Sequence, residues 1–257
     1  MPGNLSTPGA GVVSRAFALL GAFDVDHREL SLTELASRAG LPLPTAHRLA
    51  RELVGLGALE RREDYYAIGR RLWDLGLLAP VQFELRQVAA PFLQDLYGAT
   101  GATVHLGERD GGQVLYLDRL SGNASVPVVS RIGGRLPLHA TGVGKVLLAW
   151  APEDVQRQVL ASLTRVTPYT VTQPGRLREQ LRRVRREGYA QTVEEMSQGA
   201  CSVAVPIRAS PDGDVVAALG LVVPDLSRGR ARLVSALQVA AAGIGRSLRV
   251  SLSESER

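Results

Sequence analysis

Cysteine and long apolar runs are nearly absent from this chain of 257 residues. Its single cysteine, Cys201, excludes an internal disulfide framework and a thiolate metal cluster within one chain. No apolar run approaches the ~18 residues that a membrane-spanning helix needs, and the N-terminal MPGNLSTPGAG lacks the charged-then-apolar pattern of a signal peptide. Because 45% of the residues are apolar, we expect a soluble, cytoplasmic protein with one large or two modest domains.

Lysine is also scarce, since Lys145 is the only lysine among 30 basic residues, and the formal net charge is +5. A basic chain suggests a nucleic-acid partner, but residues 1–80 hold nine arginines and nine acidic residues, so the surplus lies in the second part. The total charge is therefore weak evidence for DNA binding. The local placement of arginines is stronger evidence, because several fall within one short N-terminal region: Arg48, Arg51, Arg61, Arg62, Arg70 and Arg71.

The segment from Ser31 to Leu56 predicts two helices separated by a sharp turn. Ser31 stands three residues before Glu34, which is the spacing of a capping box at a helix start. Gly40 suits the end of that helix, and Pro44 suits the first turn of the next one. Each helix has one apolar face, formed by Leu32, Leu35, Ala36 and Ala39 in the first and by Ala46, Leu49, Ala50, Leu53 and Val54 in the second.

This pattern is typical of a helix-turn-helix, whose second helix enters the DNA major groove. Its exposed face carries the candidate DNA contacts Thr45, His47, Arg48 and Arg51. An ordinary helical hairpin gives the same pattern, and the residues that follow favour the DNA interpretation. Residues 59–68 predict a β-hairpin that forms a wing with Arg61 and Arg62 near its tip, and a helix from Val12 to Val25 completes a three-helix core.

The rest of the chain predicts helices around a largely antiparallel sheet. Helices over 71–79 and 81–97, with breaks at Pro80 and Pro91, form a linker whose apolar excess indicates a contact with a partner subunit. The period then changes to two, which indicates strands. Expected strands are 103–108, 113–120, 126–132, 201–208 and 214–223, with hairpin turns at 110–112 and 211–213. Expected helices are 147–163, with a break at Pro152, 175–187 and 231–250. The arginine-rich helix at 175–187 is a solvated surface or, less favourably, a second nucleic-acid patch.

A glycine-rich run from Leu136 to Trp150 predicts an anion-binding site. Backbone amides at a glycine-rich helix start, here near Gly144, favour a negative ligand such as a carboxylate. A phosphate-binding P-loop needs a glycine five residues before Gly144 and a hydroxyl after Lys145. His139 and Val146 occupy those two positions, so we reject a P-loop.

An enzymatic alternative would use His139 as base, Cys201 as nucleophile, and Glu194 or Glu195 to orient them. A single cysteine at the start of an apolar strand more often serves packing, and burial makes it unreactive. The four histidines also lie far apart, without the spacing of metal ligands. We therefore expect no catalytic residue, no metal and no cofactor.

Several ordered segments resemble the IclR-type bacterial transcription regulators, and the resemblance covers nearly the whole chain. It implies an α+β protein with a winged helix-turn-helix domain (1–79), a linker helix (80–98) and a GAF-like effector-binding domain (99–257) in which helices flank an antiparallel sheet. It also implies dimers, or dimers of dimers, on palindromic operators. The matching segments are SLTELASRAGLPLPTAHRLARELVGLG, YAIGRRLWDLG, ATGATVHL, RIGGRLPLHATGVGKVLLAW, REGYA, VAVPIR and ALGLVVP.

The resemblance can be carried over residue by residue. Just ahead of Thr45 the family usually has a basic residue and a serine, where this chain has Leu43 and Pro44, so two phosphate contacts are lost. The effector site would use the amides of Gly142 and Val143, with His139 just before them. The family's aspartate, cysteine and two serines fall by position on Thr192, Ser202, Gly220 and Val222, while Cys201 lies one place early and faces the other side of its strand.

Loss of a carboxylate and two hydroxyls implies a wider, less polar pocket, in which keto-acid oxygens would be poorly paired. We therefore predict a regulator that binds a double-stranded operator as a homodimer or homotetramer and responds to an aromatic or largely apolar carboxylate. No membrane contact is expected. The alternatives are a small-molecule-processing enzyme with a helical dimerisation head and a structural interaction module.

Overall fold

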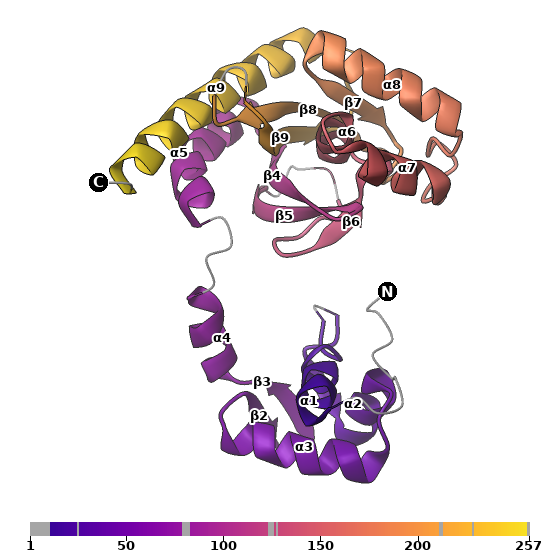
Figure 1. Ribbon diagram of the computed structural model, residues 1–257, viewed down its shortest axis with the longest axis vertical. Coiled ribbons are helices and arrows are strands. Elements are labelled where there is room, and N and C mark those ends of the chain that lie inside the picture. Colours follow the sequence, from indigo (N-terminus) through magenta and orange to yellow (C-terminus); the bar gives the residue numbers. More distant parts are fainter. Residues whose placement is uncertain are drawn as a thin grey trace. The chain divides into compact units, whose positions relative to one another are not determined.

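The computed structural model describes residues 11–24, 26–78, 83–122, 126, 128–210, 213–227 and 229–255. The chain divides into two compact units, Met1–Val81 and Gln82–Arg257. Figure 1 shows helices with a small sheet in the first unit and a larger sheet covered by helices in the second.

The first unit has the predicted winged helix-turn-helix architecture. The Ser31 side chain accepts a hydrogen bond from the Glu34 amide and the Glu34 carboxylate accepts one from the Ser31 amide, which completes the capping box. Gly40 ends that helix with a left-handed φ of 65°. The elements are α1 Val12–Leu20, β1 Glu29–Ser31, α2 Leu32–Ala39, α3 Leu43–Gly55, β2 Leu59–Arg62, β3 Tyr65–Ile68 and α4 Arg70–Leu77.

The wing has three strands rather than two. Strand β1, which the sequence pattern does not predict, pairs with β3 and gives the antiparallel order β1-β3-β2. The first helix ends at Leu20, because Gly21 closes it, and not near Val25 as predicted. Val25 itself lies outside the described residues.

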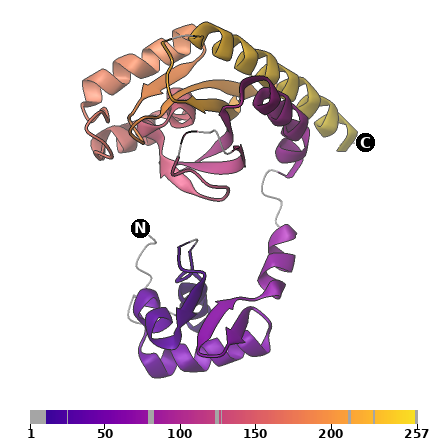
Figure 2. The ribbon, with the colours of Figure 1, turned by 180° about the vertical axis from the view of Figure 1, so that it is seen from behind.

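The second unit is built on a six-stranded antiparallel sheet in the order β6-β5-β4-β9-β8-β7. Helices α5 and α9 cover one face, and α6, α7 and α8 cover the other (Figure 2). Its elements are α5 Phe83–Thr100, β4 Thr103–Asp110, β5 Gln113–Leu120, β6 Arg135–Pro137, the 3₁₀ turn η1 Leu138–Ala140, α6 Gly142–Ala149, α7 Glu153–Ala161, α8 Pro174–Glu187, β7 Ala190–Val193, β8 Cys201–Arg208, β9 Val215–Val223 and α9 Arg230–Ser255.

The predicted strand over 126–132 is wrong, because its described residues form no strand. The chain reaches β5 only at Gly133, whose φ of 75° suits glycine and whose amide donates to the Tyr116 carbonyl. Pairing therefore begins there and continues into β6. The short strand β7 is also absent from the prediction. The turn residues 211 and 212, and the break at Pro80, lie outside the described residues.

The segment expected as a linker overlaps helix α5, which belongs to the core of the second unit. Leu85, Ala89 and Leu93 are buried in the cluster that α5 shares with α9 and the sheet. The predicted break at Pro91 is wrong, because α5 runs through it. A Cβ at Gly243 would lie only 2.3 Å from the Phe92 ring, so α5 and α9 pack closely beside that proline.

Candidate DNA-contacting surface and effector cavity

The second helix of the helix-turn-helix, α3, presents its predicted polar residues on the outside. Ala46, Leu49, Ala50 and Leu53 lie in the core of the unit, whereas Leu43 at the start of the helix is 48% exposed. Arg48 and Arg51 are exposed, and the Arg48 guanidinium lies 3.1 Å from the Glu52 carboxylate with both side chains 55% exposed. His47 is exposed and Thr45 is partly buried. This face is therefore available to an external partner.

The wing carries its two arginines differently. Arg61 Nε donates to the Glu63 carbonyl at the tip, where Glu63 has a left-handed φ of 53°. Arg62 lies between the carboxylates of Glu60, at 3.3 Å, and Glu29, at 3.1 Å, which raise the pKa of Arg62. Both arginines are exposed, but the charge of Arg62 is already balanced within the wing.

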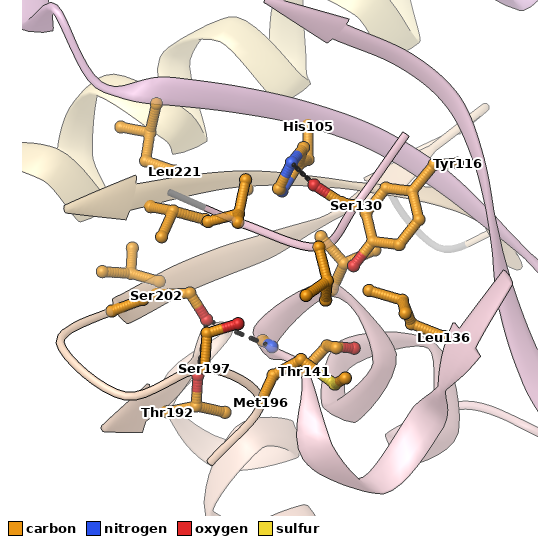
Figure 3. Close-up of a pocket in the computed structure, with 18 residues that line it drawn as sticks. His105, Tyr116, Ser130, Leu136, Thr141, Thr192, Met196, Ser197, Ser202 and Leu221 are labelled. Atoms are coloured by element: carbon orange, nitrogen blue, oxygen red, sulfur yellow. Dashed lines mark hydrogen bonds between the residues drawn. The ribbon is translucent and has the colours of Figure 1, made fainter. Parts of the chain in front are cut away.

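A cavity lies in the second unit between the sheet and the start of α6 (Figure 3). It contains six of the seven predicted effector residues: Gly142, Val143, Thr192, Ser202, Gly220 and Val222. The sequence interpretation missed other polar or flexible residues around it, namely His105, Tyr116, Ser130, Thr141, Met196 and Ser197. The alternation of side chains along a strand could have placed His105 on the cavity face. Ser130 lies in a loop, where no periodic pattern indicates which way its side chain points.

One end of the cavity is the N-terminus of α6. Thr141 caps the helix by accepting from the Gly144 amide at 3.0 Å, and the Gly142 amide donates to Ser202 Oγ at 3.2 Å. Ser202 Oγ is also 2.6 Å from Thr192 Oγ1. Because first-turn amides have no partner within a helix, the Val143 amide adds a further donor. A negative ligand group is favoured at this end by these donors and by the helix dipole.

Two glycines let α6 approach the sheet closely. A Cβ at Gly142 would lie 2.6 Å from Ser202 Oγ, so a larger residue would displace the serine. A Cβ at Gly220 would lie 2.8 Å from Val143 Cγ2. The Val143 side chain therefore occupies the space that a residue larger than glycine would need at position 220.

The other end of the cavity holds a buried histidine. His105 Nε2 lies 2.6 Å from Ser130 Oγ, and its ring packs edge-on against Tyr116 with centroids 4.9 Å apart. Burial, with a smaller effect of Arg119, lowers the pKa of His105 from 6.5 to about 3. Burial raises the pKa of Tyr116 to about 12, partly opposed by Thr141. Both side chains are therefore neutral near pH 7.

His139 does not line the cavity, so its assignment as an effector contact is wrong. The η1 turn directs it elsewhere, and its Nε2 lies 2.8 Å from the Thr164 carbonyl oxygen. Cys201 lies on the opposite face of the sheet, in the core with α5 and α9, and burial raises the pKa of its thiol. Glu195 is paired with Lys145. The groups of the enzymatic alternative are thus held apart.

Lys145, the only lysine, forms a buried ion pair with Glu195 behind the cavity. Its Nζ also donates to Gln180 Oε1 at 2.9 Å, and the lysine is 1% exposed. Burial lowers the pKa of Lys145, and the Glu195 carboxylate opposes that shift. Because Glu195 directly precedes Met196 and Ser197, the ion pair fixes one wall of the cavity to helix α6.

Among the described residues, His, Cys, Asp and Glu side chains do not gather into a group able to hold a metal ion. Within the same part of the chain, no helix combines the length and apolarity needed to cross a membrane.

Family comparisons match both units. Residues 12–63 match the IclR helix-turn-helix domain, and residues 79–246 match the bacterial transcriptional regulator IclR C-terminal domain. The chain belongs to the IclR family. It is therefore a DNA-binding transcription regulator with a ligand-binding C-terminal domain, and the relatives that it matches are regulators, not enzymes.

Three relatives illustrate the range of the match. The regulator XynR of Escherichia coli K12 is 35% identical over 213 residues, 81% of this chain and 84% of that protein. The p-hydroxybenzoate hydroxylase transcriptional activator of Acinetobacter baylyi is 32% identical over 80% of this chain and 79% of that protein. A crystal structure of an IclR homolog from Microbacterium hydrocarbonoxydans complexed with 4-hydroxybenzoate is 37% identical, with a TM-score of 0.88, 93% of this chain covered and 100% of that one.

Proposed function

We propose that this IclR-family regulator binds a palindromic operator as a dimer or dimer of dimers, and that an aromatic or largely apolar carboxylate changes its operator affinity. The observation that carries the effector assignment is the cavity, where amides and hydroxyls at the start of α6 face apolar walls. Since the proposed target is chromosomal DNA, the proposed location is the cytoplasm.

The proposed DNA contacts are Thr45, His47, Arg48 and Arg51 of α3, supported by Arg61 and Arg62 of the wing. The exposure of the polar face of α3, opposite a face whose apolar residues pack in the core, supports insertion of this helix into the major groove. Arginine at this position can contact either guanine edges or phosphates. Arg62 is expected to contribute less, because Glu29 and Glu60 already balance its charge.

The proposed effector places its carboxylate at the Gly142 and Val143 amides, beside Ser202 and Thr192. Leu136, Val143, Val222 and other apolar residues form the walls, which suit a ring better than a small keto acid. Two relatives support this class, since one is bound to 4-hydroxybenzoate and another is an activator of p-hydroxybenzoate hydroxylase by its name.

Self-association is supported by exposed apolar side chains on two helices of the first unit. Phe17 on α1 is exposed, and so are Trp73, Leu75 and Leu77 on α4. Exposed clusters of large apolar residues are typical of interaction surfaces. A dimer formed there would present two copies of α3, which matches a palindromic operator.

Footprinting on the DNA that flanks its own gene, with and without an aromatic acid, tests the proposed function. We expect a protected palindrome whose protection changes when the acid is added, and no protection by the Arg48→Ala, Arg51→Ala double variant. A thermal-shift panel of keto acids and aromatic acids tests the ligand class. Stabilisation by glyoxylate or pyruvate alone would contradict the proposed effector.

A further inference from the structure

We propose that the His105–Ser130 pair is a second polar end of the cavity that recognises a hydroxyl group on the ligand, on the far side of its ring from the carboxylate. This inference rests on the proposed function, which places an aromatic carboxylate in the cavity. It narrows the effector to the hydroxylated aromatic acids, with the hydroxyl meta or para to the carboxylate.

The two polar ends come from different parts of the fold. Figure 3 shows His105 and Ser130 on one side of the cavity and Ser202 with Thr192 on the other. Apolar side chains such as Leu136 and Val143 also line the cavity. A flat apolar ligand with one polar group at each end fits this arrangement, whereas a short keto acid would meet only one end.

The pair retains hydrogen-bonding capacity for a ligand. His105 and Ser130 are each 4% exposed, so solvent does not supply their partners. A serine hydroxyl offers one donor and two acceptor lone pairs, and the 2.6 Å bond to His105 Nε2 uses only one of them. A ligand hydroxyl can therefore donate to Ser130 Oγ or accept from it without breaking the existing bond.

The chemistry of this end favours a neutral hydroxyl over a second carboxylate. No residue lining the cavity in the described part of the chain is an arginine or a lysine. Burial keeps His105 neutral, because its pKa is about 3, so the imidazole supplies no positive charge. Arg119, whose charge contributes to the low pKa of His105, does not line the cavity. A second carboxylate would therefore be buried without a cation in direct contact, which is costly, whereas a hydroxyl needs only a hydrogen bond.

The alternative is that the pair merely fixes Ser130 and its neighbours to strand β4. A structural role predicts that loss of the Ser130 hydroxyl weakens the binding of every aromatic acid equally. Recognition of the ligand predicts a selective effect. The two roles are therefore distinguished by the ratio of the affinities for a hydroxylated and an unhydroxylated acid. The affinity for one acid alone does not distinguish them.

Calorimetric titration of the full chain with benzoate, 4-hydroxybenzoate, 2-hydroxybenzoate and terephthalate measures that ratio. We expect the wild-type protein to bind 4-hydroxybenzoate about tenfold more tightly than benzoate, as one neutral hydrogen bond allows. The ortho hydroxyl of 2-hydroxybenzoate lies next to the carboxylate and should give no such gain. Terephthalate should bind more weakly than benzoate.

Ser130→Ala should reduce the preference for 4-hydroxybenzoate over benzoate from tenfold to nearly one while leaving benzoate affinity unchanged. Ser202→Ala is the matched control at the other end, and it should weaken both ligands by the same factor. Ser130→Thr keeps a hydroxyl and should retain the preference. If Ser130→Ala does not fold, the wild-type ranking of the four acids still decides the proposal.

Equal weakening of benzoate and 4-hydroxybenzoate in Ser130→Ala would overturn the inference, and so would a wild-type protein that binds benzoate as tightly as 4-hydroxybenzoate. In both cases the proposed aromatic effector class would stand. Binding of none of the four acids would instead contradict the proposed effector class, and the hydroxyl inference with it.

Discussion

The DNA-contacting face of α3 and the effector cavity hold their polar residues in opposite ways. Arg48 and Arg51 are exposed and make few contacts within the chain. The cavity's His105, Ser202 and Thr192 are largely buried and pair with side chains from other elements. The difference implies that changes on α3 should alter binding but not stability, whereas changes around the cavity should alter both.

Lys145→Met should give the largest effect, on stability. Removing one member of a buried ion pair leaves Glu195 charged without a partner, which typically costs about 3–5 kcal/mol. Urea unfolding followed by Trp150 fluorescence, in a Trp73→Phe background, measures the free energy of unfolding of the second unit. Arg183→Met is the matched control, because its ion pair with Glu187 is exposed and should contribute little to stability. Similar decreases in the free energy of unfolding of the two variants would contradict the predicted difference between buried and exposed ion pairs.

Arg48→Ala or Arg51→Ala should weaken operator binding by about 1–3 kcal/mol each if the arginine contacts a base. The free energy of unfolding should stay unchanged, because neither side chain is part of the core. Fluorescence anisotropy with labelled operator measures the affinity. Arg178→Ala on α8 is the control, since that exposed arginine is predicted to be solvated. An effect at Arg178 as large as that at Arg48 would favour a second nucleic-acid patch.

The stability of the second unit should fall as the pH drops below about 6.5. The unfolded chain binds a proton at His105 below that value, whereas the native state, with a His105 pKa of about 3, does not. As the pH falls from 6.5 to 3, this difference in proton binding lowers the free energy of unfolding by about 1.4 kcal/mol per pH unit. His105→Gln, which does not titrate, should lose about 2 kcal/mol less between pH 6.5 and 5 in urea unfolding. Identical slopes in the two proteins would show that His105 is protonated in the native state.

Ser31→Ala should give the smallest effect, a loss of about 1 kcal/mol in the stability of the first unit. The hydroxyl accepts from the Glu34 amide at 3.3 Å and donates to the Glu34 carboxylate at 2.7 Å, and alanine removes both bonds. Ser37→Ala, at an exposed position within the same helix, is the control and should not destabilise. Unfolding followed by Trp73 fluorescence compares them, and equal stability would exclude a role for the capping box.

Most of the first unit could be predicted because its signals are local. The capping box at Ser31, the glycine at position 40 and the apolar faces of α2 and α3 all lie within one short segment. Strand β1 was missed because it is three residues long and exists only by pairing with β3. The continuity of α5 through Pro91 was missed because packing against α9 overrides the local preference of proline.

The cavity could be predicted only in part. The glycine-rich start of α6 is a contiguous pattern, and the family resemblance placed Thr192 and Ser202 beside it. The opposite end joins His105 and Ser130, which are 25 residues apart, through a loop with no regular pattern. The same applies to His139, whose orientation depends on a single 3₁₀ turn. Contacts of this kind follow from tertiary packing and leave no periodic trace in the sequence.

The central claim is that a ligand in the cavity of the second unit changes how tightly the first unit holds DNA. Operator affinity, measured by anisotropy with and without saturating 4-hydroxybenzoate, tests this claim most directly. We expect the operator Kd of the wild-type protein to change at least about fivefold. Ser202→Ala should need a higher ligand concentration to show the same change. An unchanged Kd, under conditions where calorimetry shows that the cavity is occupied, would contradict this claim.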